Sequence, residues 1–341
     1  MLGTFAKTSQ TDRPSSMSVS DIVLDLSRPD RCSIPARSHE IRLFSVMRNE
    51  ALRIPHFIKY YSEKGVDRFF VVDNGSTDET TELLTSYRNV HVFHTYRSYA
   101  EARYGMEWIE ALLSSFGKDY WCIVADADEL LTYPGAEQIP ISQLCSYLDT
   151  ERASALHCVL VDMYSDKAFS QTEYSSGEDL LKVCPFFECN TIRCHASLRG
   201  SRNGNWSYAG GMRRRVFGVT VRLDKWALIR YSSAMQLYPG MHRVKGAVAS
   251  QLRGAVLHFK FLSDFPTRVI LESGRHEHWR NAREYKIYSE IQAGVNSLSA
   301  YGPMSKRLST SADLIRCGIM RCPKEFRAYL KAQSPNRTGL T

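Results

Sequence analysis

An apolar segment of strand length ends at two carboxylates that are one residue apart. The segment covers residues 121–125, and Asp126 and Asp128 follow it. Because side chains alternate between the two faces of an extended chain, both carboxylates point the same way off the end of a strand. Two carboxylates that converge repel each other unless a cation lies between them. A hard divalent ion with oxygen ligands meets that need, and such ions usually hold phosphates as well. The pattern therefore indicates a metal-bound phosphate donor.

An isolated Asp-x-Asp pair is weak evidence for a metal site, since most such pairs are helix caps or solvated turn residues. A second motif upstream supports the metal interpretation. A strand of buried type over 69–72 ends in a turn rich in Asp, Asn and Gly over 73–77. Before it, a strand over 41–47 leads into the polar residues 48–50, and the apolar spacing over 52–64 predicts a helix. Polar residues thus follow the strands at their carboxyl ends, where ligands of open α/β sheets bind.

These stretches resemble the family 2 glycosyltransferases of the GT-A fold. The matching residues are SVMRNEALRIPHFIKYYSEKGVDRFFVVDNGSTDET at 45–80 and WCIVADADELLTYPG at 121–135, and a looser likeness continues in GGMRRRVFG at 210–218 and VLHFKFL at 256–262. The resemblance implies an α/β fold, with a GT-A-like, Rossmann-type mixed sheet flanked by helices and an elaborated C-terminal acceptor half. It also implies a metal-dependent hexosyltransferase that moves a sugar, with inversion, from a nucleotide diphosphate to a polysaccharide, lipopolysaccharide or other glycan acceptor.

The chain divides into three parts by composition and by this resemblance. Residues 1–38 are rich in Ser, Thr, Arg, Asp and Pro, and we expect them to be mostly disordered. Residues 39–300 are expected to form the GT-A domain, in which 39–135 are the nucleotide-binding half and 136–300 are the acceptor half. Residues 301–341 read as a C-terminal tail, a polar loop with one weak helix.

The resemblance places a set of polar residues beside the nucleotide. Asp73 is expected to grip the base, since a carboxylate accepts the imide or amino hydrogens of a base edge; capping of its own turn is the alternative. Arg103, at the start of a helix expected over 99–116, suits phosphate because a guanidinium binds it bidentately, although a solvated helix arginine would look the same. The full nucleotide-binding set is Arg48, Asn49, Glu50, Asp73, Asn74, Arg103 and Asp126.

The same resemblance implies a metal centre with Mn²⁺ or Mg²⁺ as the cofactor. Asp126 and Asp128 match the metal-binding pair of the family, and His258 is the candidate for a third ligand. A lone histidine within a strand such as VLHFKF is more often a core residue. Imidazole is less typical than oxygen for magnesium, but it suits manganese.

The catalytic base is the least marked part of the site. Inverting transfer needs a carboxylate that deprotonates the acceptor hydroxyl, and family 2 enzymes often show a Glu-Asp pair well after the metal motif. No such pair is clearly placed here. Asp162, at the end of a strand expected over 155–163, is the first choice, and Asp166 and Glu272 are the others. This departure from the family pattern leaves the stereochemical outcome open.

The charge balance is basic, with a formal net charge of +8. A nucleotide-sugar donor and an anionic membrane surface account for this excess, and no nucleic-acid motif accompanies it. Gly210 and Gly211 precede three arginines, which indicates a loop that approaches an anionic group of a donor, an acceptor or a lipid. No stretch approaches the roughly 18–20 apolar residues of a spanning helix, and no apolar leader begins the sequence. We therefore expect a cytoplasmic protein that can contact the inner face of a membrane.

Three other functions share part of this pattern. A haloacid dehalogenase-type phosphatase also places Asp-x-Asp at a strand end, but its motif normally continues with Thr or Val, whereas Glu129 follows here. A nucleotidyltransferase also binds a metal ion and a nucleotide phosphate, but it usually has a Gly-rich basic loop near its N-terminus. Residues 45–52 do not have that composition. A pseudoenzyme that binds a nucleotide sugar or a carbohydrate without turnover is supported by the missing Glu-Asp pair. Donor hydrolysis distinguishes it from an active transferase.

Overall fold

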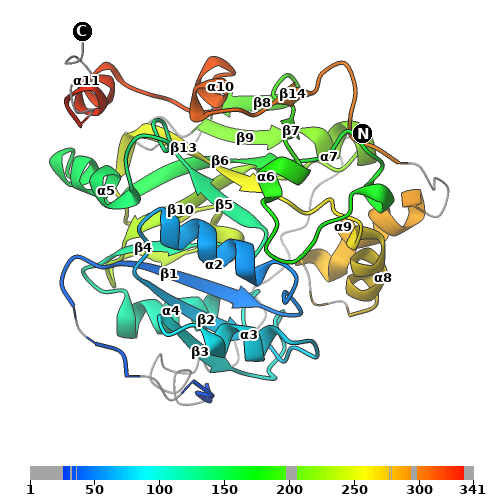
Figure 1. The fold of residues 1–341 in the computed structure, drawn as a ribbon, viewed down its shortest axis with the longest axis horizontal. Coiled ribbons are helices and arrows are strands. Elements are labelled where there is room, and N and C mark those ends of the chain that lie inside the picture. Colours follow the sequence, from blue (N-terminus) through cyan, green and yellow to red (C-terminus); the bar gives the residue numbers. More distant parts are fainter. Residues whose placement is uncertain are drawn as a thin grey trace, which may run out of the picture.

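An eight-stranded mixed sheet forms the centre of the molecule (Figure 1). The computed structural model describes residues 26–30, 33–35, 37–196, 206–275, 277, 279–292 and 298–333. Across the sheet the strands follow the order β3 (Val90–His94), β2 (Arg68–Asp73), β1 (Ile41–Met47), β4 (Trp121–Val124), β10 (Asp224–Arg230), β6 (Ala155–Asp162), β13 (Ala249–His258) and β5 (Glu129–Thr132). The predicted α/β class, a Rossmann-type mixed sheet flanked by helices, is confirmed.

The strand directions bring most carboxyl ends to one edge of the sheet. Strands β3, β2, β1, β4, β6 and β13 run one way, while β10 and β5 run the other way. The register sets Met47 beside Asp73 at the end of β1 and β2. It sets His258 beside both Asp162 and Glu129 at the other side of the sheet. Residues that are far apart in the sequence therefore meet along this edge.

Both faces of the sheet are covered, as the continuous apolar strands require. Successive side chains of a strand point to opposite faces, so Leu43 belongs to one core cluster and Phe44 to another. Helices α2 (Ile54–Glu63) and α5 (Ile141–Thr150) pack into the first cluster. Helix α4 (Met106–Phe116) packs into the second.

A third, aromatic cluster lies beyond the end of β13. It joins α7 (Met212–Phe217), α8 (Phe265–Arg275) and α9 (Trp279–Gln292). Figure 1 shows α8 and α9 side by side near the edge of the sheet where the parallel strands end. The rings that pack together are those of Phe169, Phe217, Phe261, Phe265 and Tyr288. This packing holds α8 and α9 together at this edge of the sheet.

Short elements fill the remaining connections. They are α3 (Thr80–Ser86), η1 (Phe169–Gln171), α6 (Leu180–Val183), β7 (Phe186–Phe187), β8 (Ile192–Ala196), β9 (Trp206–Gly210), β11 (Gln236–Leu237), η2 (Pro239–Met241) and β12 (Val244–Lys245). Strand β8 pairs with β9, and β11 pairs with β12, each in a small antiparallel sheet.

The C-terminal segment has more structure than the sequence indicated. Strand β14 (Lys306–Arg307) pairs with β7, and two helices follow, α10 (Ser311–Arg316) and α11 (Lys324–Gln333). Phe326 is fully buried, and its ring lies 4.7 Å from that of Tyr147 on α5. The sequence pattern of this helix is weak because much of its stability comes from tertiary packing, as of Phe326 on Tyr147.

Part of the N-terminal segment packs along the sheet. Ser27 and His94 exchange two backbone hydrogen bonds of 3.1 and 2.8 Å, so the chain adds a bridge beside β3. Residues 1–25, 31–32 and 36 lie outside the described residues, and the expectation of disorder there stays a prediction. Among the described residues, no helix combines the length and the apolar character needed to cross a membrane.

Candidate active site

A pocket of about 910 Å³ opens at the carboxyl edge of the sheet. Its walls come from the ends of β1, β2, β4 and β13, from the start of β10, and from α8 and α9. The predicted site residues that line it are Arg48, Glu50, Asn74, Asp126, Asp128, His258 and Glu272. Most of the residues that the sequence suggested are thus brought to one cavity.

The turn between β4 and β5 concentrates negative charge on this pocket. Asp126, Asp128 and Glu129 all line it, and the backbone N–H of Asp126 donates to Glu129 Oε2 at 3.4 Å. Burial and the neighbouring carboxylate of Glu129 raise the pKa of Asp126 to about 7. The balancing cation is Lys225 on β10, whose Nζ lies 2.6 Å from Glu129 Oε1. Lys225 on one side and His258 on the other, with its Nε2 3.4 Å from Asp128 Oδ2, therefore lie against this group of carboxylates.

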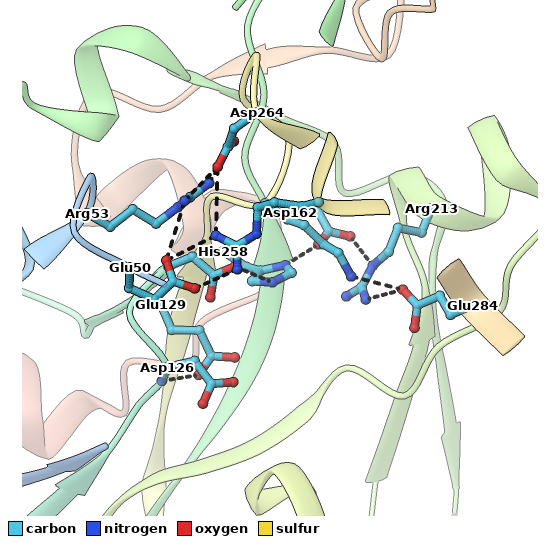
Figure 2. Close-up of polar contacts among 12 residues, drawn as sticks. Glu50, Arg53, Asp126, Glu129, Asp162, Arg213, His258, Asp264 and Glu284 are labelled. Carbon is cyan, nitrogen blue, oxygen red and sulfur yellow. Dashed lines mark hydrogen bonds and ion pairs between the residues drawn. The ribbon is translucent and has the colours of Figure 1, made fainter. Parts of the chain in front are cut away.

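His258 lies between two carboxylates at the end of β13. Its Nδ1 is 2.8 Å from Asp162 Oδ1, and its Nε2 is 3.4 Å from Asp128 Oδ2. Burial disfavours the charged imidazole, but the two carboxylates outweigh burial and raise the pKa of His258 to about 9. The ring is therefore fixed with one nitrogen toward Asp162 and the other toward the Asp-x-Asp motif (Figure 2).

Asp162 is buried and engaged through both oxygens. One oxygen binds His258, and the other accepts a 2.9 Å hydrogen bond from Arg213 Nε. Burial opposes ionisation of the carboxyl, but Arg213 and His258 hold its pKa below the ordinary value. Asp162 is not among the residues that line the pocket. This geometry fits a residue that positions His258 better than one that deprotonates an acceptor.

A second polar network, which includes Glu50, Arg53 and Asp264, lies on the side of His258 opposite Arg213 (Figure 2). Arg268 on α8 donates to both oxygens of Glu50, at 3.0 and 2.5 Å. Arg53 donates to both oxygens of Asp264 at 2.9 and 3.0 Å, and it also reaches Glu50 at 3.4 Å. Glu50, predicted as a nucleotide ligand, thus ties the exit of β1 to α8.

Hydrogen bonds join the turn after β1 to the turn after β2. Arg48 Nη1 donates to the carbonyl of Asn74 at 2.7 Å, and both residues line the pocket. Asn49 is exposed, and its Oδ1 accepts from Thr77 N at 2.7 Å, outside the pocket lining. Arg48 and Asn74 therefore present polar groups to a ligand, while Asn49 joins the two turns.

Asp73 is fully buried and serves its own turn. One oxygen accepts 2.9 and 2.6 Å hydrogen bonds from the backbone N–H and the hydroxyl of Ser76, and the other accepts from the Thr81 hydroxyl. Asp73 is not among the residues that line the pocket. This arrangement is the capping alternative that the sequence left open beside base recognition.

Two further candidates lie away from the pocket lining. Arg103 is exposed and pairs with Glu107 and Glu110 on α4. The helix begins at Met106 rather than near residue 99, because Arg103 and the two residues after it adopt positive φ. Asp166 is also exposed and does not line the pocket.

The acidic residues fit a divalent cation in part. Within the described chain, no group of three or more His, Cys, Asp and Glu side chains is arranged to hold a metal ion. Asp126 and Asp128 nevertheless offer carboxylate oxygens to the pocket, where burial and the carboxylate of Glu129 raise the pKa of Asp126. Oxygen ligands of this kind suit Mg²⁺ and Mn²⁺, which commonly complete their coordination with water and substrate phosphates.

Several basic residues that line the pocket were not predicted from the sequence, among them Lys225, Lys260 and Arg268. Lys260 follows His258 by two residues, so alternation along an extended chain would have placed the two on one face. Nothing local marks Lys225, since only the antiparallel insertion of β10 between β4 and β6 brings it to the site.

Sequence comparison gives one limited likeness. No protein-family model matches the chain. A glycosyltransferase family 92 protein of Oryza sativa subsp. japonica is 26% identical over 111 residues, which are 30% of this chain and 18% of that protein. The chain is thus similar in part to a glycosyltransferase, and its placement in family 2 stays a prediction.

Structural likenesses are distant. Glucosyl-3-phosphoglycerate synthase from Mycobacterium tuberculosis, solved with Mn²⁺, UDP and glucosyl-3-phosphoglycerate, is 16% identical over 46% of this chain and 51% of its own, with a TM-score of 0.23. A 4-diphosphocytidyl-2C-methyl-D-erythritol synthase is 11% identical over 83% of this chain and 99% of its own, with a TM-score of 0.29. The inositol-1-phosphate CTP transferase of T. maritima is 12% identical over 77% and 99%, with a TM-score of 0.30.

Proposed function

We propose that this protein is a metal-dependent glycosyltransferase that uses a nucleotide-diphosphate sugar. The observation that carries the proposal is the convergence of Asp126 and Asp128 with Arg48 and Asn74 in one pocket at the carboxyl edge of the sheet. Ligands of open α/β sheets bind at this edge. The partial sequence likeness to a family 92 glycosyltransferase supports the same reaction class.

The residues of the pocket divide the work of binding the donor. Arg48 and Asn74 would hold the nucleotide at the ends of β1 and β2, where a guanidinium suits phosphate. Asp126 and Asp128, with His258 beside them, would hold Mn²⁺ or Mg²⁺. A bound cation of this kind neutralises charge on a leaving diphosphate as a Lewis acid. Asp162 keeps the His258 ring oriented, as carboxylates do for ligating histidines.

The acceptor hydroxyl needs a base on the pocket wall. Of the three carboxylates considered from the sequence, Glu272 lines the pocket, whereas Asp162 and Asp166 do not. We assign the base role to Glu272 and an inverting course to the transfer. The acceptor is proposed to be a glycan or a lipid-linked glycan, because the second half of the pocket is built from the acceptor-half elements β13, α8 and α9.

A panel of nucleoside diphosphates and nucleotide sugars, with and without Mn²⁺, tests the proposal. We expect one nucleotide class to raise the melting temperature with the metal, since binding stabilises the folded state by mass action. The matching nucleotide sugar should be hydrolysed slowly. Asp128→Asn should abolish both effects, while Asp166→Asn, which changes an exposed carboxylate outside the pocket lining, should leave them unchanged. Equal nucleotide affinity with metal and with chelator would contradict the metal-dependent reading.

A binding protein without turnover is the second candidate. The observation in its favour is that three pocket carboxylates outside the Asp-x-Asp pair are ion-paired: Glu50 with Arg268, Glu129 with Lys225, and Glu272 with Arg275. Such a protein would bind the nucleotide sugar and metal in the panel above, yet it would release no nucleoside diphosphate. Donor hydrolysis therefore decides between the two candidates.

A further inference from the structure

Arg213 lines the pocket, and its guanidinium has one nitrogen without a hydrogen-bond partner in the described part of the chain. Its side chain is 6% exposed, Nε donates to Asp162 at 2.9 Å, and Nη1 donates to Glu284 at 3.2 Å. Its Nη2 is buried and has no hydrogen-bond partner among the residues that the structure describes. Buried polar groups in proteins are nearly always hydrogen-bonded. An unpaired donor on a charged group beside a pocket therefore points to a partner that is not part of the chain.

Lys260 is a second cation of the same pocket that is only partly neutralised. Its Nζ makes no hydrogen bond within the described part of the chain, and its nearest carboxylate oxygen, on Glu284, is 3.6 Å away. The ammonium instead lies 4.3 Å from the ring centre of Tyr285 and 5.1 Å from that of Tyr288. The same Glu284 oxygen also accepts from Arg213 and Tyr288. One carboxylate oxygen is thus shared among three donor groups.

The location of these cations separates them from the nucleotide-binding turns. Arg213 is hydrogen-bonded to Asp162, the last residue of β6, and Lys260 lies two residues beyond the end of β13. Both strands lie across β4 and β10 from β1 and β2, which carry Arg48 and Asn74. Figure 2 shows Arg213 and Glu284 on the opposite side of His258 from the Arg53 network. The pair therefore belongs to the acceptor half of the pocket.

We propose that Arg213 and Lys260 form an oxyanion subsite, and that the sugar acceptor carries a phosphate group that binds there. A guanidinium and an ammonium together match the double charge of a phosphate monoester, and the guanidinium still has a donor to offer. This inference rests on the proposed function where it assigns the phosphate to the acceptor. The subsite itself rests on the contacts of the two cations.

The neighbouring Arg214 provides a matched control. It follows Arg213 in the same run of three arginines and on the same helix, but it is exposed and does not line the pocket. Loss of its charge changes the overall charge of the protein by the same amount as loss of Lys260. Nonspecific attraction of phosphate to a basic surface would depend on Arg214 and Lys260 equally, whereas a built subsite depends on Lys260.

Isothermal titration with glycerol 3-phosphate tests the subsite, and glycerol serves as the neutral control ligand. The full-length protein is titrated alone, and again when saturated with Mg²⁺ and the nucleoside diphosphate that binds best. We expect glycerol 3-phosphate, but not glycerol, to bind the nucleotide-loaded protein. Arg213→Lys and Lys260→Gln should each weaken this binding by about tenfold, the order expected for a hydrogen bond to a charged group. Arg214→Gln should leave the affinity unchanged, and nucleotide affinity should be unchanged in all three variants.

Three results would overturn the inference. Equal binding of glycerol 3-phosphate by the wild type, Arg213→Lys and Lys260→Gln would remove the subsite. Binding that occurs only without nucleotide, and that nucleotide abolishes, would assign the phosphate to the donor. Absence of binding in both titrations would also refute it. If nucleotide itself does not bind, the proposed function fails separately, and the titration without nucleotide still tests the two cations. If Arg213→Lys does not fold, as a thermal melt would show, Lys260→Gln carries the test.

Discussion

Replacing Asp162 with Asn separates a residue that positions His258 from a catalytic base. The carboxylate is buried, with one oxygen 2.8 Å from His258 Nδ1 and the other 2.9 Å from Arg213 Nε. An amide of the same shape offers one oxygen and one NH₂ group. The NH₂ group must then face either the imidazole or the guanidinium, both of which act as donors here.

The size of the effect follows from these contacts. The Asp162 side chain is 2% exposed, and that of Arg213 is 6% exposed, so removal of the negative charge deprives a buried cation of its closer carboxylate and leaves it Glu284 at 3.2 Å. Breaking a buried pair in this way typically costs about 3 kcal/mol or more. We expect the free energy of unfolding of the Asp162→Asn variant to fall by about 3 kcal/mol, and its metal-dependent nucleotide affinity to fall with the orientation of His258.

Urea unfolding and calorimetry with Mn²⁺ and nucleoside diphosphate measure both quantities. Asp166→Asn is the control, because Asp166 is exposed and lies four residues along the chain. A positioning role predicts losses of stability and of nucleotide affinity that the control does not show. If stability and nucleotide affinity were normal while sugar transfer fell by about 10²–10⁴-fold, the magnitude typical of a general base, the positioning argument would be refuted and Asp162 restored as the base.

Three further outcomes follow from the site. In the metal-free protein the pKa of His258 is raised to about 9 from an ordinary 6.5, so its stabilising effect is complete below pH 6.5 and is lost as pH rises through 9. Urea unfolding from pH 6 to 10 should show a loss of about 3 kcal/mol that is absent in His258→Gln; parallel curves would contradict this. Asp73→Ala should lower the free energy of unfolding by about 2 kcal/mol through lost hydrogen bonds to a carboxylate, and calorimetry should find nucleotide affinity unchanged, whereas a base-reading Asp73 would show the reverse. Glu272→Gln should reduce sugar transfer by about 10²–10⁴-fold with donor hydrolysis and nucleotide affinity retained in parallel assays; unchanged transfer would exclude Glu272 as the base.

The strand ends were predictable from the sequence because their signals are local. The apolar run before Asp126 and the polar turn after 69–72 each mark the end of a buried strand within a few residues. Parallel strands of one sheet end together, so the convergence of Arg48, Asn74 and Asp128 needed no long-range information beyond the βαβ order. These local signals were enough to predict the α/β class and the edge of the sheet at which the pocket lies.

The partner of each charged group was not predictable, because it depends on strands inserted from elsewhere. Asp162 follows a strand just as Asp126 does, and the sequence cannot show that β13 brings His258 beside it. The role of Glu50 was likewise hidden, since the guanidinium that it binds belongs to Arg268, more than 200 residues away. For Asp73 the partner is local, in the Ser76 turn, and the sequence offered capping beside base recognition without deciding between them. A lone carboxylate at a strand end looks the same whether it meets a ligand or an arginine.

From the distribution of charge in the pocket we infer how the proposed substrates would be oriented. Around the end of β4, the carboxylates of Asp126, Asp128 and Glu129 lie beside Lys225 and His258, and there we propose that a divalent cation and, with it, a diphosphate bind. Beyond His258, Arg213 pairs with Asp162 and shares one oxygen of Glu284 with Lys260, and there we propose that the anionic group of the acceptor binds. A donor bound through its metal and an acceptor bound through its own negative charge would therefore enter from opposite ends of the cavity. Their reacting groups would meet near His258, where the two regions adjoin.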